Sequence, residues 1–531
     1  MSDSDSANSS GRFAWLRTGR STVAGGATIL MVSYVLSRVL GLGREVAISA
    51  RFGTSDELAA YVAAFRLPDL AFLLFAGGAL SSAYIPLYRE ALARDDPVAT
   101  RAFTSSVLNA VIIALAFFVA VIILLAPWLV PLIAPGFDSE GQRLTVMLLG
   151  IVAFSPLLLA ASEVLTATLH ARQHFLLPSF SPLLYNLAIV IGAIVLALWW
   201  GILGVAAGVV IGAALHFLVQ IPAFRALGPG YRPLLNVELP ALKRLIQLTV
   251  PRMAGLVVVH LSLIFIMVTM ASTLGKEMVA AMNYAWIVMM LPLGVFGMSV
   301  ARAWFPQFAA AAVDGPTPEL AGQLTTAIRT VLFFLLPAAA GLMLFAPLVV
   351  AALFERGEFD ATSTELTAWA LLFFGLGLAG HGAVEVLNRG FFALKDTRTP
   401  VLIAIVSMGL GIVLAYLLMR PLAQGGLALG ISLAVLLEAV WLWVLLARRV
   451  PDFRFLGGMP SLILCTLLAA GVGGALQWLI PLTESPAIVR LVLYGVVLLG
   501  VYVVAALLLG VPEARTVWQR MPLIGRRLNT D

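Results

Sequence analysis

Arginine side chains lie within stretches of this sequence that are otherwise apolar enough to sit in lipid. Arg38 and Arg44 fall in the run S-R-V-L-G-L-G-R-E, and Arg66 stands near the start of F-R-L-P-D-L-A-F-L-L-F. A charge at the bilayer centre costs about 2.5–3.5 kcal/mol on insertion scales, so such residues usually face a polar cavity. Guanidinium groups bind phosphate in a bidentate manner. The three arginines therefore predict a site for an anionic ligand, with phosphate the favoured group.

Glu45 directly follows Arg44 and belongs to the same candidate site. Gly41 and Gly43 precede the pair, which predicts a broken helix whose loosened backbone lines a cavity. Two alternatives remain open from the residues alone. Arg44 and Glu45 are an ordinary helix end, or Glu45 forms an internal ion pair with Arg38.

Three more basic side chains have both a ligand role and a structural alternative. Arg66 lies on one helical face with Asp69, so a local ion pair competes with substrate contact. Arg252 is a candidate cavity residue, with anchoring at the inner membrane surface as its alternative. A single histidine in an apolar helix favours hydrogen-bonded packing over a pH switch, but His260 aligns with Arg38 in an internal repeat and is therefore also a candidate cavity residue.

Glu163 and Glu385 are carboxylates at equivalent positions in the two halves of the chain. Burial disfavours the charged form of a carboxyl group, so the two are candidates for proton coupling or for pairing with a cavity arginine. The alternative is that each is solvated near the inner surface, or paired with Arg172 or Arg389 respectively.

The composition is that of a polytopic membrane protein. Of the 531 residues, 61% are hydrophobic and only 11% are charged, whereas soluble proteins have roughly 25% charged residues. The net charge of +6 is spread over short loops, so it does not indicate nucleic-acid binding. The sequence contains no metal-ligand cluster, nucleophile motif, phosphate loop or redox motif, and we therefore expect no enzymatic activity and no bound metal.

Fourteen apolar runs have the length of a membrane span. Placing both termini inside puts about 23 basic residues on the inner side and about 7 on the outer side, which is the positive-inside pattern. The sequence thus predicts an all-α protein with both termini in the cytoplasm. The runs cover residues 22–43, 57–88, 102–133, 143–169, 176–200, 202–223, 242–273, 278–303, 325–353, 364–390, 399–419, 425–447, 459–481 and 489–511.

The chain resembles itself at an offset of about 222 residues. The run F-D-S-E-G-Q-R-L-T from Phe137 corresponds to F-D-A-T-S-T-E-L-T from Phe359. Each copy holds six spans and keeps the same orientation, so we expect two six-helix lobes in a parallel pseudo-twofold repeat plus two extra C-terminal helices. Such repeats are a transporter design. The expected segments are a cytoplasmic N-terminal segment (1–21), an N-lobe (22–224), a cytoplasmic linker (225–241), a C-lobe (242–450), the two extra helices (451–511) and a cytoplasmic basic tail (512–531).

The motifs as a set resemble the lipid II flippase (MurJ or MviN) family. They are the S-R-V-L-G-L-G-R-E opening, F-A-G-G-A-L-S-S-A-Y-I-P ending at Pro86, L-F-E-R-G-E-F from Leu353 and F-F-A-L-K-D-T-R-T-P from Phe391. The resemblance implies the two-lobed fold of the multidrug/oligosaccharidyl-lipid/polysaccharide exporter superfamily. It also implies movement of lipid II, the undecaprenyl-pyrophosphate-linked peptidoglycan precursor, from the inner to the outer leaflet for cell-wall synthesis. A pyrophosphate cannot cross hydrocarbon unaided, so a cationic cavity suits this cargo.

The resemblance carries over residue by residue only in part. Arg38 and Arg44 match two first-helix arginines that the family uses in its cavity. Glu45 stands where an aspartate is usual, and Arg66 stands where a lysine or arginine is usual. The substrate-binding set that the resemblance implies therefore lies in the first half of the chain.

Several positions depart from the family's charged pattern. Ala59 replaces an aspartate, and Phe72 and Gly77 occupy positions that are Arg and Glu in well-studied members. In the eighth span, Ile287 and its neighbour Trp286 stand where charged residues are expected. These departures bear on which lipid-linked substrate is recognised.

The resemblance also implies partners and location. The expected partners are a lipid-linked glycan pyrophosphate, membrane lipids and other cell-wall synthesis proteins, in the plasma (inner) membrane. No cofactor is expected; the family is linked to membrane potential, sometimes with a cation, and no residue identifies the ion. Two alternatives stay open: a divergent paralogue that flips another polyprenyl-linked saccharide, and a transport-inactive cell-wall scaffold.

Overall fold

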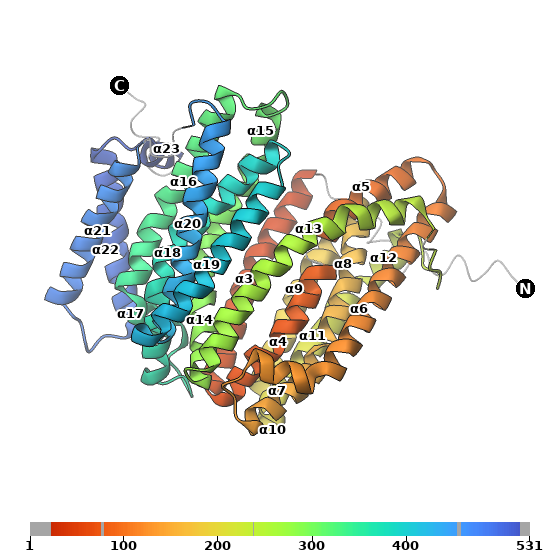
Figure 1. Ribbon diagram of the computed structural model, residues 1–531, viewed down its shortest axis with the longest axis horizontal. Coiled ribbons are helices and arrows are strands. Elements are labelled where there is room, and N and C mark those ends of the chain that lie inside the picture. The colour runs from red at the N-terminus through yellow and green to blue at the C-terminus, as the bar shows by residue number, and fades with distance from the viewer. Residues whose placement is uncertain (1–22, 76–78, 237, 454–457, 521–531) are drawn as a thin grey trace, which may run out of the picture. The chain divides into compact units, whose positions relative to one another are not determined.

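The structure is a computed structural model that describes residues 23–75, 79–236, 238–453 and 458–520 (Figure 1). Every described element is helical. The chain divides into two compact units, unit 1 (Met1–Leu261) and unit 2 (Ser262–Asp531). Each unit is described by itself.

Unit 1 contains the first six predicted spans and most of the seventh. Several spans are built from two or three consecutive helices, because Gly, Pro or a short turn interrupts the backbone without ending the run. The helices are α3 (Val23–Phe52), α4 (Asp56–Phe75), α5 (Ala79–Ala93), α6 (Pro97–Ile133), α7 (Ser139–Val152), α8 (Ser155–Ala171), α9 (Leu176–Ile191), the π-helix η1 (Gly192–Leu196), α10 (Ala197–Trp200), α11 (Ile202–Leu218), α12 (Ile221–Leu227) and α13 (Pro240–Ile264), whose last residues pass into unit 2.

Unit 2 contains the remaining predicted spans. Two further π-helices lie inside it, each continuous with an α-helix. The helices are η2 (Phe265–Met270), α14 (Lys276–Pro292), η3 (Leu293–Met298), α15 (Ser299–Ala311), α16 (Pro318–Leu344), α17 (Ala346–Phe354), α18 (Ala361–Ala393), α19 (Arg398–Leu422), α20 (Gln424–Arg449), α21 (Met459–Leu479), α22 (Ala487–Leu508) and α23 (Pro512–Arg520).

Twelve of the described helical segments are long and apolar enough to cross a membrane. They coincide with twelve of the fourteen predicted spans. The other two predicted spans correspond to α3 and to α13 with η2, which are outside this set. The all-α membrane architecture is confirmed, and the count of fourteen spans stays a prediction.

The predicted break in the first helix is wrong. α3 runs without interruption from Val23 to Phe52, through Gly41 and Gly43. Glycine in a helix interior costs roughly 1 kcal/mol relative to alanine, which a long helix tolerates. A Cβ at Gly41 would lie 3.9 Å from the amide oxygen of Asn186, which is an ordinary van der Waals distance. Arg44 and Glu45 therefore lie on continuous helix rather than at a helix end.

The internal repeat appears in the backbone at an offset of 222 residues. Gly201 and Ala423 both have positive φ, 51° and 48°, in the turns before α11 and α20. Gln173 and Lys395 likewise have φ of 61° and 62° after α8 and α18. These matched turns give the two halves the same helix connections, as parallel repeats require.

The repeat also preserves a closely packed helix pair in each unit. On α11, a Cβ at Gly204 would lie 2.5 Å from the carbonyl carbon of Leu196. At the matching position on α20, a Cβ at Gly426 would overlap the backbone of α19, and one at Gly430 would lie 2.6 Å from Ala415 Cα. Small residues allow membrane helices to approach this closely, and Figure 1 shows α19 and α20 side by side.

Candidate functional site

The site in unit 1 is centred on Arg44 of α3. Its Nε and Nη2 atoms donate hydrogen bonds to Glu45 Oε1, at 3.0 and 2.5 Å. Its Nη1 atom donates to Asn186 Oδ1 of α9, at 3.2 Å. The Arg44 side chain keeps 27% of its surface exposed. Glu45 and Asn186 thus hold the guanidinium in place.

Asn186 is the contact that sequence reasoning missed. It is 7% exposed, and its Nδ2 atom donates to the Pro182 carbonyl oxygen at 3.0 Å, one turn earlier in α9. Longer contacts of 3.5 Å join the same atom to the backbone and hydroxyl oxygens of Ser37. The amide oxygen is therefore aimed at Arg44. No sequence signal marks this residue, because it lies 142 positions from its partner.

α4 adds opposite charges to the same site. Asp69 interacts electrostatically with both Arg66 and Arg44, and its side chain is exposed. Tyr61 of α4 and Tyr185 of α9 also interact with Arg44. The expected Arg66–Asp69 pair is thus one part of a larger cluster. The charges of its two arginines and two carboxylates sum to zero.

Arg38 lies apart from this cluster. It is exposed, and its Nε and Nη2 atoms donate to the hydroxyl of Tyr34 at 3.2 and 3.0 Å, one turn earlier in α3. The guanidinium carbon also lies 5.2 Å from the centre of the Tyr34 ring. The alternative of an internal pair between Arg38 and Glu45 is wrong, because Glu45 binds Arg44. Arg38 keeps an accessible charge on the same helix.

His260, half-buried on α13, interacts electrostatically with Arg66. Its Nε2 atom has no hydrogen-bond partner in the described part of the chain. His260 therefore lies within electrostatic range of Arg66, and its cavity-facing position stays a prediction. The side chain of Arg252 lies outside the described residues, and so does Gly77.

The two equivalent carboxylates have different partners. Glu163 accepts a hydrogen bond from Ser81 Oγ at 2.6 Å, and Arg172 instead donates to Tyr88. Glu385 forms an ion pair with Arg389, at 2.6 Å, one turn along α18. The paired alternative is thus right for Glu385 and wrong for Glu163. Neither contact tests the proposed role in coupling.

A carboxylate that sequence reasoning passed over lies on α20. Glu438 is 6% exposed, and the described residues offer it neither an ion pair nor a hydrogen bond. Among the described residues, no group of three or more His, Cys, Asp or Glu side chains could hold a metal ion.

The sequence model of the family described as "Lipid II flippase MurJ" matches residues 48–498. The chain belongs to the lipid II flippase MurJ family. Lipid II flippase MurJ of Burkholderia cenocepacia is 32% identical over 82% of this chain and 87% of its own. Probable lipid II flippase MurJ of Rhizobium tropici is 31% identical over 78% and 79%.

Solved structures agree with the fold of the MurJ family. "Lipid II flippase MurJ, inward closed conformation" matches with a TM-score of 0.77 and 24% identity, over 91% of this chain and 98% of that chain. An inward-facing multidrug resistance MATE family transporter matches with a TM-score of 0.65 and 17% identity, over 79% and 98%. At these identities the likeness shows the fold alone.

Positions that depart from the charged pattern of the MurJ family lie in apolar surroundings here. Ala59 is fully buried in α4, and Phe72 packs against a cluster that includes Ala71 and Leu115. Ile287 is half-buried on α14. These three side chains supply no charge at their positions.

Proposed function

We propose that this chain is a lipid II flippase, which moves the undecaprenyl-pyrophosphate-linked peptidoglycan precursor from the inner to the outer leaflet by alternating access. The observation that carries the proposal is Arg44, held by Glu45 and Asn186 on the long helix α3 of a MurJ-family chain. A transporter of this kind makes and breaks no covalent bond, so the proposal includes no catalytic residue.

The charge balance of the site suggests how the pyrophosphate enters. Arg44 and Arg66 are neutralised by Glu45 and Asp69 when no substrate is present. A pyrophosphate carries more charge than a carboxylate and accepts bidentate hydrogen bonds from guanidinium groups. It therefore displaces the carboxylates from the arginines, while Asn186 keeps Arg44 in position. Release reverses the exchange, since the carboxylates return to their partners.

The remaining features of the proposal follow from charge distribution and family. Both termini are cytoplasmic, because basic residues concentrate on the connections of that side. The membrane is the bacterial plasma (inner) membrane. Membrane potential acts on the charged cargo and site, at about 2.3 kcal/mol per elementary charge per 100 mV. Protein partners of this chain are other components of cell-wall synthesis.

A second candidate is a paralogue that flips another polyprenyl-linked saccharide. The buried Ala59 and the apolar Phe72 and Ile287 favour it, since a different headgroup needs different polar contacts. Both candidates use the same pyrophosphate site at Arg44. They differ only in the glycan.

The test is complementation of a bacterial strain whose own lipid II flippase can be depleted. Wild type, Arg44→Ala and Arg38→Ala are expressed in parallel, with Arg51→Ala as the matched control. Arg51 is an exposed arginine in the last turn of the same helix. Membrane insertion of each variant is checked by fractionation.

We expect wild type and Arg51→Ala to restore growth and Arg44→Ala to fail. Loss of two charge-assisted hydrogen bonds to phosphate, at about 1.5–3 kcal/mol each, lowers transport by about 100-fold or more. Growth with inserted Arg44→Ala contradicts the arginine site. Failure of inserted wild type, with lipid II remaining in the inner leaflet, supports the paralogue or a transport-inactive scaffold.

A further inference from the structure

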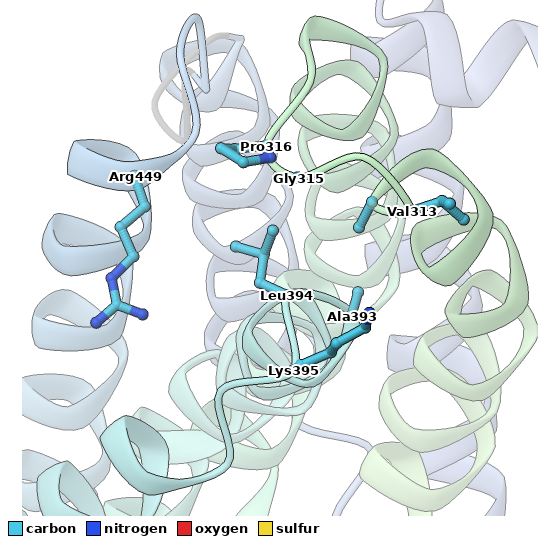
Figure 2. A pocket seen from close by; sticks show the side chains of 8 residues that line it. Val313, Gly315, Pro316, Ala393, Leu394, Lys395 and Arg449 are labelled. Carbon is cyan, nitrogen blue, oxygen red and sulfur yellow. The ribbon is translucent and has the colours of Figure 1, made fainter.

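A cavity of about 430 Å³ lies in unit 2, and its lining includes no residue of the arginine site. Three segments form its wall: the loop after α15, the turn after α18 and the end of α20. Figure 2 shows Leu394 and Lys395 between Arg449 on one side and Val313 on the other. The lining residues are Ala312, Val313, Gly315, Pro316, Ala393, Leu394, Lys395 and Arg449.

The charge of this cavity is positive. Lys395 and Arg449 line it, and none of the eight lining residues is acidic. The Lys395 ammonium has no hydrogen bond or ion pair within the described ranges, and the side chain is exposed. Its charge is therefore available to a ligand.

Arg449 is held in position by neighbours just outside the cavity. Its guanidinium binds Asp396 and donates to Thr399 Oγ1 at 3.3 Å. The same group lies 5.3 Å from the centre of the Phe391 ring. Asp396 in turn accepts hydrogen bonds from two backbone N–H groups at the start of α19, so both of its carboxylate oxygens have partners. Asp396 thus orients Arg449 and does not pair with Lys395.

The two cations are not required by the fold of the turn. The internal repeat places Gln173 at the position of Lys395 and Leu227 at the position of Arg449. Gln173 adopts the same left-handed backbone, with φ of 61° against 62°. Unit 1 builds the same turn without either charge. The charge pair is therefore a property of this cavity rather than of the repeat.

The position of the cavity indicates which kind of anion it binds. It lies at the ends of α18, α19 and α20, three helices long and apolar enough to span the membrane. Val313, which lines the cavity, is 69% exposed, and Phe392, next in sequence to the lining residue Ala393, is 40% exposed. Cationic side chains together with exposed apolar side chains, at the ends of such helices, match the level where lipid headgroups meet acyl chains.

We propose that this cavity binds the phosphate of an anionic phospholipid headgroup. The Lys395 ammonium donates hydrogen bonds to the phosphate oxygens, Arg449 adds positive charge on the other side of Leu394, and the glycerol and upper acyl chain contact Leu394 and Val313. A bound headgroup ties the loop after α15 to the ends of α18 and α20. The site is independent of the transported substrate.

The experiment uses the purified full chain in a nonionic detergent. Dihexanoyl phosphatidylglycerol is titrated, and binding is followed by the rise in the thermal unfolding midpoint. Dihexanoyl phosphatidylcholine tests the need for negative charge, and glycerol 1-phosphate tests the need for acyl chains. The variants are Lys395→Gln, which copies the residue of the other repeat, and Lys395→Arg. Arg448→Gln is the matched control, because it removes a neighbouring exposed charge that does not line the cavity.

We expect saturable binding of phosphatidylglycerol to wild type, to Lys395→Arg and to Arg448→Gln. Lys395→Gln should weaken it by about tenfold or more, since a charged hydrogen bond is lost, without moving the midpoint of the lipid-free protein. Equal weakening by Arg448→Gln, or no weakening by Lys395→Gln, overturns the site. Equal binding of phosphatidylcholine or of glycerol 1-phosphate overturns the assignment to an anionic lipid.

Discussion

Asp396 gives a prediction whose size can be worked from the structure. Its Oδ1 atom accepts hydrogen bonds from the backbone N–H groups of Arg398 and Thr399, both at 3.0 Å. Its Oδ2 atom accepts one from the Thr399 hydroxyl at 2.6 Å and pairs with Arg449. The carboxylate therefore closes the start of α19 and joins it to the end of α20.

These contacts set the pKa of Asp396. Burial raises it, but the hydrogen bonds from Thr399, the Arg398 N–H group and Arg449 outweigh burial and lower the pKa to about 2. The ordinary value is about 3.9, so the difference corresponds to about 2 kcal/mol of folding free energy. Water screens part of this, because 20% of the side chain is exposed. We expect Asp396→Asn to destabilise the protein by about 1–2 kcal/mol at pH 7.

The pH dependence of this stabilisation follows from the lowered pKa of Asp396. The charged carboxylate stabilises the folded state fully above about pH 4, where the unfolded chain is also ionised. This stabilisation is lost as the pH falls from about 4 through about 2, since the folded carboxyl group then becomes protonated. The difference in folding free energy between wild type and Asp396→Asn should therefore disappear as the pH falls over that range.

The assay is thermal unfolding of the purified chain in detergent, at pH 7, 5, 4 and 3. Asp314→Asn is the matched control, because Asp314 is exposed in the loop after α15 and removes the same charge. We expect a lower midpoint for Asp396→Asn at pH 7 and a smaller difference at pH 3. The reasoning is refuted if both variants shift the midpoint equally, or if the difference at pH 3 is as large as at pH 7.

Two further predictions concern the arginine site and the close helix pair of unit 2. Asn186→Ala removes the hydrogen bond that fixes Arg44, so transport should fall by about tenfold or more. Membrane insertion should stay normal. Unchanged transport in a lipid II accessibility assay contradicts the positioning role. Gly430→Ala places a Cβ 2.6 Å from Ala415 Cα and should cost about 1–3 kcal/mol of stability. The control Gly409→Ala meets no atom within 4 Å, and an equal loss of thermal stability in both variants would count against this packing.

The membrane architecture could be predicted from local sequence features alone. Long apolar runs imply helices, because backbone polar groups in lipid must be satisfied within the segment. The repeat at 222 residues was visible in the sequence, and the matched turns at Gly201 and Ala423 agree with it. These features depend on composition and order along the chain, which need no knowledge of packing.

One prediction from local sequence, the break in the first helix, was wrong. Gly41 and Gly43 predicted a broken helix, yet α3 continues through both. In a membrane, breaking a helix exposes unsatisfied backbone groups, which costs more than two glycines in a helix interior. A sequence pattern that marks a break in water is thus weak evidence for one in lipid.

The partners of the charged residues were decided by tertiary structure. Arg44 was identified from its type and its apolar surroundings, whereas Asn186 came into view only when α9 packed against α3. Glu163 and Glu385 occupy equivalent positions in the repeat, yet one binds Ser81 and the other Arg389. The sequence determined which charges lie within apolar segments, and such charges are notable because burying a charge is costly. Helix packing decided which groups neutralise them, because hydrogen bonds act over about 3 Å and join residues far apart in the chain.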